Sequence, residues 1–240
     1  MIRSEDGDAM IKAARSGDIN KVVEYLDAGV SIESTDQYGN TALTRACDNG
    51  SIELVTCLLE RKADVNHVNQ FQCCAIHGAS MAGNEDVVEC LIQYGAHVNR
   101  PSSRGNRPLH FAALYCKEGL ISLLLANGAD PTLVNEDGKN TIDAVKDGSI
   151  FNERVIHALY SHCAALFFDE GRLLLHLSLV KDNYSWLEDI QYIANANAKA
   201  VETKDPVTGL HPFQLAAVKT IHLDSCFGLL REAPYLLMKK

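Results

Sequence analysis

Cys73, Cys74 and His77 lie close together in the sequence and are of residue types that bind zinc. Thiolate and imidazole are preferred zinc ligands, but a structural zinc site takes four of them. No second pair follows at ligand spacing, and the sequence has no Cys-x-x-Cys motif. We therefore expect no metal, and we expect the eight cysteines to be free thiols that pack as small apolar residues.

Motifs for catalysis and phosphate binding are also missing from the sequence. It lacks G-x-x-x-x-G-K-[ST], G-x-G-x-x-G, G-x-S-x-G and H-E-x-x-H. Gly138 and Lys139 form a Gly-Lys pair, but no second glycine stands where it could cradle a phosphate. A Cys–His nucleophile assembled in three dimensions has no local signature in the sequence. We expect a protein without enzymatic activity and without a cofactor.

The charge balance restricts the class of partner. Acidic residues outnumber basic ones by 31 to 22, which gives a net charge of −9 and argues against binding to nucleic acid or to an anionic membrane. No uninterrupted apolar run is long enough to span a bilayer. The first ten residues are too polar for a targeting peptide, so we expect a soluble protein of the cytoplasm, with the nucleus as the alternative.

A period of 33 residues runs through the sequence and indicates how these side chains are positioned. One register position holds Gly39, Gln72, Gly105, Gly138 and Gly171, and four residues later it gives Leu43, Ile76, Leu109, Ile142 and Leu175. Each unit contains a turn, a short helix, a second turn and a second helix whose apolar residues recur at helical spacing. Such units bury their apolar faces only against their neighbours, which predicts an all-α repeat solenoid.

The motifs GNTALTRAC (39–47), GNRPLHFAA (105–113) and GLHPFQLAA (209–217), with LLLANGAD (123–130), resemble ankyrin repeats. The resemblance covers essentially the whole chain and is strongest over residues 36–148. It implies helix-turn-helix units joined by hairpin-like loops, and structural hydrogen bonds from the histidines of one register position, His77, His110 and His176. We expect one domain over residues 1–240, with its last two repeats irregular and units near 3–35, 36–68, 69–101, 102–134, 135–167, 168–205 and 206–240.

The resemblance also implies a concave face, formed by the hairpin tips and the first helices, that binds another protein. Apolar side chains in adjacent repeats would form a patch there, and the segment between Glu89 and Glu118 has basic residues but no acidic ones. Arginines in this segment favour a partner with an acidic or phosphorylated segment. The alternatives are that Phe111 and Leu114 pack inside their own repeat and that the arginines are merely solvated. The predicted partner-binding residues are Tyr38, Arg45, Phe71, Met81, Arg104, Arg107, Phe111 and Tyr115.

Asn66 is a candidate for hydroxylation, because Leu58 followed by Asp64-Val65-Asn66 resembles the context of modified ankyrin-repeat asparagines. In the family generally this asparagine bonds across the hairpin, which is the alternative role. We expect a non-catalytic interaction module that acts as a scaffold, adaptor or inhibitor. One alternative is a structural subunit of a large assembly, favoured by the apolar C-terminal residues Leu229, Leu230, Leu236 and Leu237. Another is an effector or enzyme with an activity in the divergent C-terminal third. The oligomeric state stays open.

Overall fold

The computed structural model describes residues 4–115, 117–147, 159 and 210. The chain divides into two compact units, Met1–Val155 and Ile156–Lys240, and the helices described here belong to the first. They are α1 (Ser4–Arg15), α2 (Ile19–Asp27), α3 (Ala42–Asn49), α4 (Ile52–Glu60), α5 (Ala75–Ala82), α6 (Glu85–Gln93), α7 (Pro108–Leu114), α8 (Glu118–Ala126) and α9 (Thr141–Asp147). No strand occurs among the described residues. The prediction of an all-α repeat structure is confirmed.

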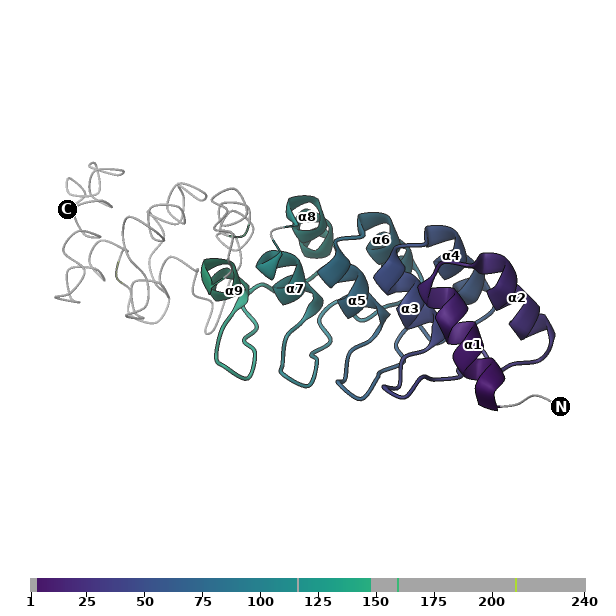
Figure 1. Cartoon of the computed structure of the whole chain (residues 1–240). Helices are drawn as coiled ribbons and strands as arrows, with labels where there is room; N and C mark the ends of the chain where they lie inside the picture. The colour runs from purple at the N-terminus through teal and green to yellow at the C-terminus, as the bar shows by residue number, and fades with distance from the viewer. Residues whose placement is uncertain (1–3, 116, 148–158, 160–209, 211–240) are drawn as a thin grey trace. The chain divides into compact units, whose positions relative to one another are not determined.

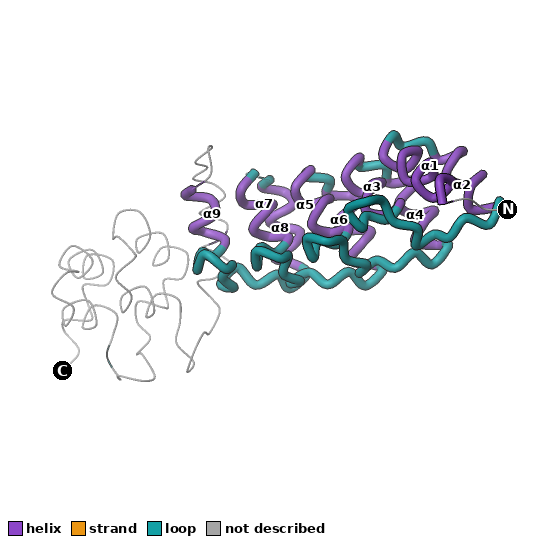
Figure 2. Tube along the Cα trace, turned by 60° about the horizontal axis from the view of Figure 1, so that its bottom comes forward, coloured by secondary structure: helices purple, strands orange, loops and turns teal. Residues whose placement is uncertain are grey.

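The helices of this unit form two rows (Figure 1). In the first row α3 packs against α1 and α5, and α7 packs against α5 and α9. In the second row α6 packs against α4 and α8. The long loops between successive helix pairs lie side by side along one edge of the unit (Figure 2). Each helix pair therefore meets its neighbours through the same faces.

The core lies between the two rows and repeats the same apolar positions. Leu43, Ile76 and Leu109 of the first row are at most 1% exposed. The second row contributes Leu58, Leu91 and Leu124, which are fully buried. These residues stand at the 33-residue interval, so each contacts the equivalent layer of the next repeat rather than a separate core.

Glycine ends two of the first-row helices, α3 and α5, and turns the chain. Gly50 and Gly83 cap α3 and α5 with φ of 82°, a left-handed conformation that glycine adopts without steric cost. Two other residues adopt positive φ where their register neighbours are glycine: Lys62 at 71° and Gln72 at 55°. At these two positions the backbone conformation favours glycine, but the residue present has a side chain.

Several sequence predictions fall outside the described residues. These are the irregular units 168–205 and 206–240, most of the unit 135–167, His176 and the apolar C-terminal leucines. The extent of the domain stays a prediction.

Candidate functional site

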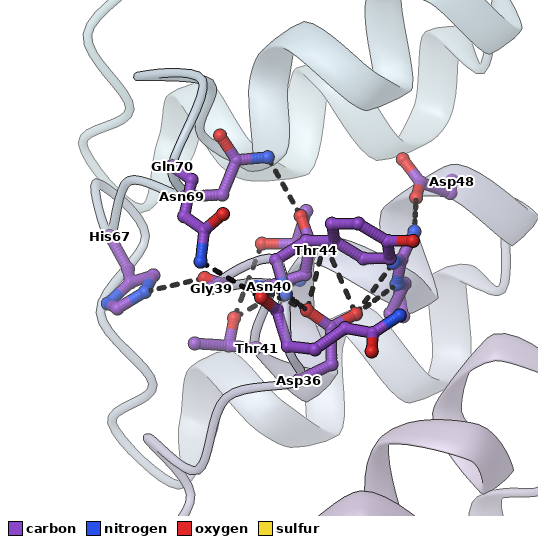
Figure 3. Close-up of polar contacts among 12 residues, drawn as sticks. Asp36, Gly39, Asn40, Thr41, Thr44, Asp48, His67, Asn69 and Gln70 are labelled. Atoms are coloured by element: carbon purple, nitrogen blue, oxygen red, sulfur yellow. Dashed lines mark hydrogen bonds and ion pairs between the residues drawn. The ribbon is translucent and has the colours of Figure 1, made fainter.

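The hairpin tips are held by one side chain at the start of each loop. The Oδ1 atom of Asp36 accepts hydrogen bonds from the backbone N–H groups of Tyr38 and Asn40, both at 2.9 Å (Figure 3). In the next hairpin the Oδ1 atom of Asn69 accepts from Phe71 at 2.9 Å and Cys73 at 3.0 Å. This Asx-type turn directs the loop without a regular strand and places Tyr38 and Phe71 at equivalent tips.

Adjacent hairpins are joined to one another by backbone hydrogen bonds. Gln70 N–H donates to the carbonyl of Tyr38 at 3.0 Å, and Ser103 N–H donates to that of Phe71 at 2.8 Å. The carbonyl of Arg104 accepts from the following hairpin at 3.1 Å. Tyr38, Phe71 and Arg104 therefore form a row with a spacing fixed by the backbone.

Two histidines tie the first-row helices to these hairpins. The Nδ1 atom of His77 accepts from Cys74 N–H at 3.1 Å, and its Nε2 donates to the carbonyl of Arg100 at 2.9 Å. His110 bonds Arg107 N–H at 3.3 Å and the carbonyl of Lys139 at 3.2 Å in the same way. Burial lowers the pKa of His77 to about 4 and lowers that of His110. Both imidazoles are neutral structural links, as the family resemblance implied.

A groove of about 340 Å³ lies between the hairpin tips and the first-row helices. Its apolar walls are Tyr38, Phe71, Met81 and Phe111, and Gly78 lies on its lining where no side chain intervenes. Tyr38, Phe71 and Met81 are 45%, 54% and 47% exposed, which is unusual for such large apolar side chains in one place. Phe111 is half-buried because its ring packs edge-on against His77, with ring centroids 5.9 Å apart.

A second groove of about 520 Å³ shares Met81 and Gly78 with the first. It extends over Asp48 to Arg15 on one side and to Tyr115 on the other, and Tyr115 is 48% exposed. The structure thus brings together most of the predicted partner-binding residues. Five line the first groove (Tyr38, Arg45, Phe71, Met81, Phe111), and Tyr115 lines the second.

Arg45 makes ion pairs within the protein. Its Nη2 lies 2.6 Å from Asp36 Oδ2 and its Nη1 lies 3.2 Å from Asp48 Oδ2 (Figure 3). Burial opposes ionisation of Asp36, but the N–H of Asn40 and the Arg45 guanidinium outweigh it, so the pKa of Asp36 lies below its ordinary value. Burial raises the pKa of Asp48 despite the nearby guanidinium. Arg45 therefore shapes the groove wall by holding two carboxylates in place.

The two arginines of the central hairpin differ in what they contact. Arg107 donates through Nη1 to the carbonyl of Gly105 at 3.0 Å and to that of Val134 at 2.9 Å, so it joins two hairpins. Arg104 is exposed, and its side chain makes no hydrogen bond or ion pair with the described part of the chain. Of the pair, only Arg104 presents a free guanidinium to a partner. Their predicted role in binding is untested by these contacts.

Asn66 links the ends of two repeats. Its Nδ2 donates to the carbonyl of Gly95 at 3.0 Å, and its Oδ1 accepts from His97 N–H at 3.0 Å. Asn99 repeats both bonds one unit later, to Gly128 and from Asp130, each at 2.8 Å. The cross-hairpin role is therefore present, and hydroxylation of Asn66 stays a prediction.

Burial favours the protonated form of three thiols of the described residues. Cys47, Cys73 and Cys74 have a raised pKa because of burial, and Cys74 Sγ lies 3.3 Å from the Nδ1 of His77. A nucleophilic cysteine needs the opposite shift. Within residues 4–115 and 117–147, no three His, Cys, Asp or Glu side chains are grouped as a metal site would require.

Comparison with models of protein families identifies the family to which the chain is related. A family model described as ankyrin repeats (3 copies) matches residues 2–69 and 61–135. The chain belongs to the ankyrin-repeat family. A search of curated proteins finds no significant match. Ankyrin repeats generally mediate protein–protein interaction, and ankyrin-repeat proteins are typically not enzymes.

The partners of ankyrin repeats are proteins, and the helices give no indication of a transmembrane segment. None of the helices described for this ankyrin array is both long and apolar enough to cross a bilayer. Sequence reasoning missed the ion pairs of Arg45 with Asp36 and Asp48 and the bonds of Arg107. These contacts depend on where each hairpin returns in space, and no local motif encodes that path.

Proposed function

We propose that this ankyrin array is a non-catalytic module that binds another protein in the groove between its hairpin tips and first-row helices. The observation that carries the proposal is the exposure of Tyr38, Phe71 and Met81 around one hollow. Large apolar side chains gathered on a surface favour burial by a partner, and aromatic side chains dominate the energy of many interfaces. In this role the protein acts as a scaffold, adaptor or inhibitor in the cytoplasm or nucleus.

Arginine near the groove supports a partner segment that carries carboxylate or phosphate groups. Arg104 stands one hairpin beyond Phe71 and is exposed. A guanidinium pairs with these anions through two parallel hydrogen bonds, which adds geometric specificity. The second-row helices α2, α4, α6 and α8 have a negative charge, opposite to that of Arg104, since their acidic side chains outnumber their single basic residue, Lys21.

A comparison of captured partners tests this function. The full chain and a triple variant, with Phe71, Met81 and Tyr115 changed to alanine, are used as bait in a native lysate and bound proteins are identified by mass spectrometry. Tyr94→Ala is the matched control, because Tyr94 is 42% exposed at the end of α6 in the other helix row. Proteins retained by the wild type and control but lost from the triple variant support the proposal. Retention by all three baits contradicts it.

A further inference from the structure

The register of the first-row helices places a glycine between two large side chains. Arg45, Gly78 and Phe111 occupy equivalent positions in successive repeats, 33 residues apart. Gly78 lies inside α5 and lines both grooves. Glycine is unfavourable within a helix by roughly 0.5–1 kcal/mol relative to alanine, so it needs a local reason.

The reason is a close approach to the preceding repeat. A Cβ atom at Gly78 would collide with the Oδ1 of Asp48, whose other oxygen pairs with Arg45. The missing side chain therefore makes room for Asp48 and leaves a hollow between Arg45 and Phe111. Phe71 and Met81 form its exposed apolar rim.

The charges around this hollow are asymmetric. On the side of α3, the Arg45 guanidinium is compensated by Asp36 and Asp48. The helices α5 and α7 add no charge to the floor, because they contain no Asp, Glu, Lys or Arg; the carboxylate that reaches Gly78 is that of Asp48 from α3. On the other side, the hairpin of residues 97–107 has three arginines, Arg100, Arg104 and Arg107, and no acidic residue.

The positive charge of this hairpin extends to the groove floor. Burial is the main cause of the low pKa of His77, and the charge of Arg100 acts in the same direction. Arg100 also lowers the pKa of Cys74 against the larger effect of burial. Arg100 therefore contributes a positive potential to the side of the groove that holds His77 and Cys74, while Asp48 acts in the opposite direction on Cys73.

From this arrangement we infer that the hollow over Gly78 is a specificity pocket for one bulky apolar side chain of a partner segment, whose adjacent acidic residues lie toward Arg104. The inference rests on the proposed function, and names the chemistry that the groove selects. An apolar side chain displaces water from the walls of Phe71, Met81 and Phe111. The neighbouring carboxylates pair with Arg104, the exposed guanidinium of the hairpin.

Selection of short peptides tests the inference directly. A phage-displayed library of random 12-residue peptides is selected on the full chain, and the enriched peptides are measured by fluorescence anisotropy. We expect one large apolar position flanked on one side by Asp or Glu, and a loss of at least about tenfold in affinity when that position is changed to alanine. Peptides without an apolar position, peptides with basic flanks, or failure to enrich any binder would overturn the inference.

Protein variants locate the pocket. Gly78→Leu fills the hollow and should weaken binding by about tenfold or more. Gly78→Ala also displaces the Asp48 carboxylate but does not fill the hollow, so it is the control for that displacement and should have a smaller effect. Arg104→Glu should lower the affinity for acidic peptides by at least about fivefold. It should leave unchanged the affinity for peptides whose acidic residues are replaced by glutamine. Lys62→Glu is the matched charge control, because Lys62 is exposed on the loop after α4. Circular dichroism establishes that each variant folds.

The outcomes separate the inference from the proposed function. If Phe71→Ala/Met81→Ala weakens binding but Gly78→Leu leaves it unchanged, the groove binds a partner and the pocket inference is wrong. If neither variant changes the affinity, both are wrong. A peptide with phosphoserine in place of its acidic residue then shows which anion Arg104 prefers, and weaker binding of both anions to Arg104→Glu is the supporting result.

Discussion

Lys62 adopts a left-handed backbone that its side chain disfavours. Its φ is 71°, whereas the equivalent positions in the next two repeats are Gly95 and Gly128. A residue with a Cβ costs roughly 1–2 kcal/mol in this conformation. Substitution by glycine would remove this cost, but the larger conformational entropy of glycine in the unfolded state offsets part of the gain in stability. We predict that Lys62→Gly raises the free energy of unfolding by about 0.5–1 kcal/mol, measured by urea denaturation. Lys62→Ala retains the strain and should show no such gain; a lower stability of Lys62→Gly would contradict the argument.

Protonation of His77 should destabilise the fold. The Nδ1 lone pair accepts from Cys74 N–H, so a proton there removes the bond and places a charge in a buried site. The folded pKa of about 4 lies below the unfolded value of 6.5, so the unfolded state binds the proton first. Stability contributed by neutral His77 is complete above pH 6.5 and is lost as the pH falls toward 4, by up to about 3 kcal/mol.

The measurement compares the pH dependence of two proteins. Urea denaturation between pH 7 and 4 should give a steeper loss of stability for the wild type than for His77→Gln, which cannot take up the proton. Carboxylates titrate equally in both, so the difference between the curves isolates the histidine. Parallel curves would show that His77 does not titrate in this range.

At the scale of the elements, hairpin packing depends on the absence of a side chain at Gly105. A Cβ there would lie 2.9 Å from the backbone N of Glu136, whereas nothing lies within 4 Å of a Cβ at Gly128. Both glycines have positive φ, 72° and 83°. We predict that Gly128→Ala costs about 1 kcal/mol of unfolding free energy from backbone strain alone, and that Gly105→Ala costs about 1–2 kcal/mol more.

Hydrogen exchange identifies where the additional cost arises. In Gly105→Ala the amide of Glu136, which donates to the carbonyl of Arg104 at 3.1 Å, should exchange faster. In Gly128→Ala the protection of the Glu136 amide against exchange should fall no more than that of the other hairpin amides. Equal destabilisation by the two substitutions would mean that the contact between hairpins is soft enough to absorb a methyl group.

The sequence was sufficient to predict the helices but not all of the site. Residues such as Leu43 and Leu58 recur at a fixed interval, and burial at each follows from that interval alone. The partners of Arg45 could not be predicted in this way, because Asp36 reaches it only through the turn that its own carboxylate forms. Gly78 had a readable signal, its register with Arg45 and Phe111. The collision with Asp48 that explains it depends on the distance between repeats.

At the scale of the whole described unit, acidic charge is concentrated in the second helix row, whereas α1, α3 and α9 of the first row carry charges of both signs. The first-row helices α5 and α7 carry no charged residue, while the second row is acidic; its acidic side chains are Glu24, Asp27, Glu53, Glu60, Glu85, Asp86, Glu89 and Glu118. The overall charge of −9 therefore does not describe the groove. For the acidic partner segment proposed above, we expect repulsion by the second row and attraction toward Arg104, which would orient its approach.

Stability of the array should depend on where a repeat is damaged. Ile76 and Met10 are both fully buried, but α5 contacts α3, α6 and α7, whereas α1 contacts α2 and α3. In a linear stack each repeat is stabilised by its neighbours, so loss of a central interface affects repeats on both sides.

We predict that Ile76→Ala lowers the unfolding free energy by about 2–4 kcal/mol and reduces amide protection in α3 through α7. Met10→Ala should reduce protection mainly in α1 and α2, because the remaining repeats keep their interfaces. Hydrogen exchange with mass spectrometry distinguishes the two patterns, and a uniform loss of protection in both variants would show that the repeats unfold as one cooperative body rather than as coupled neighbours.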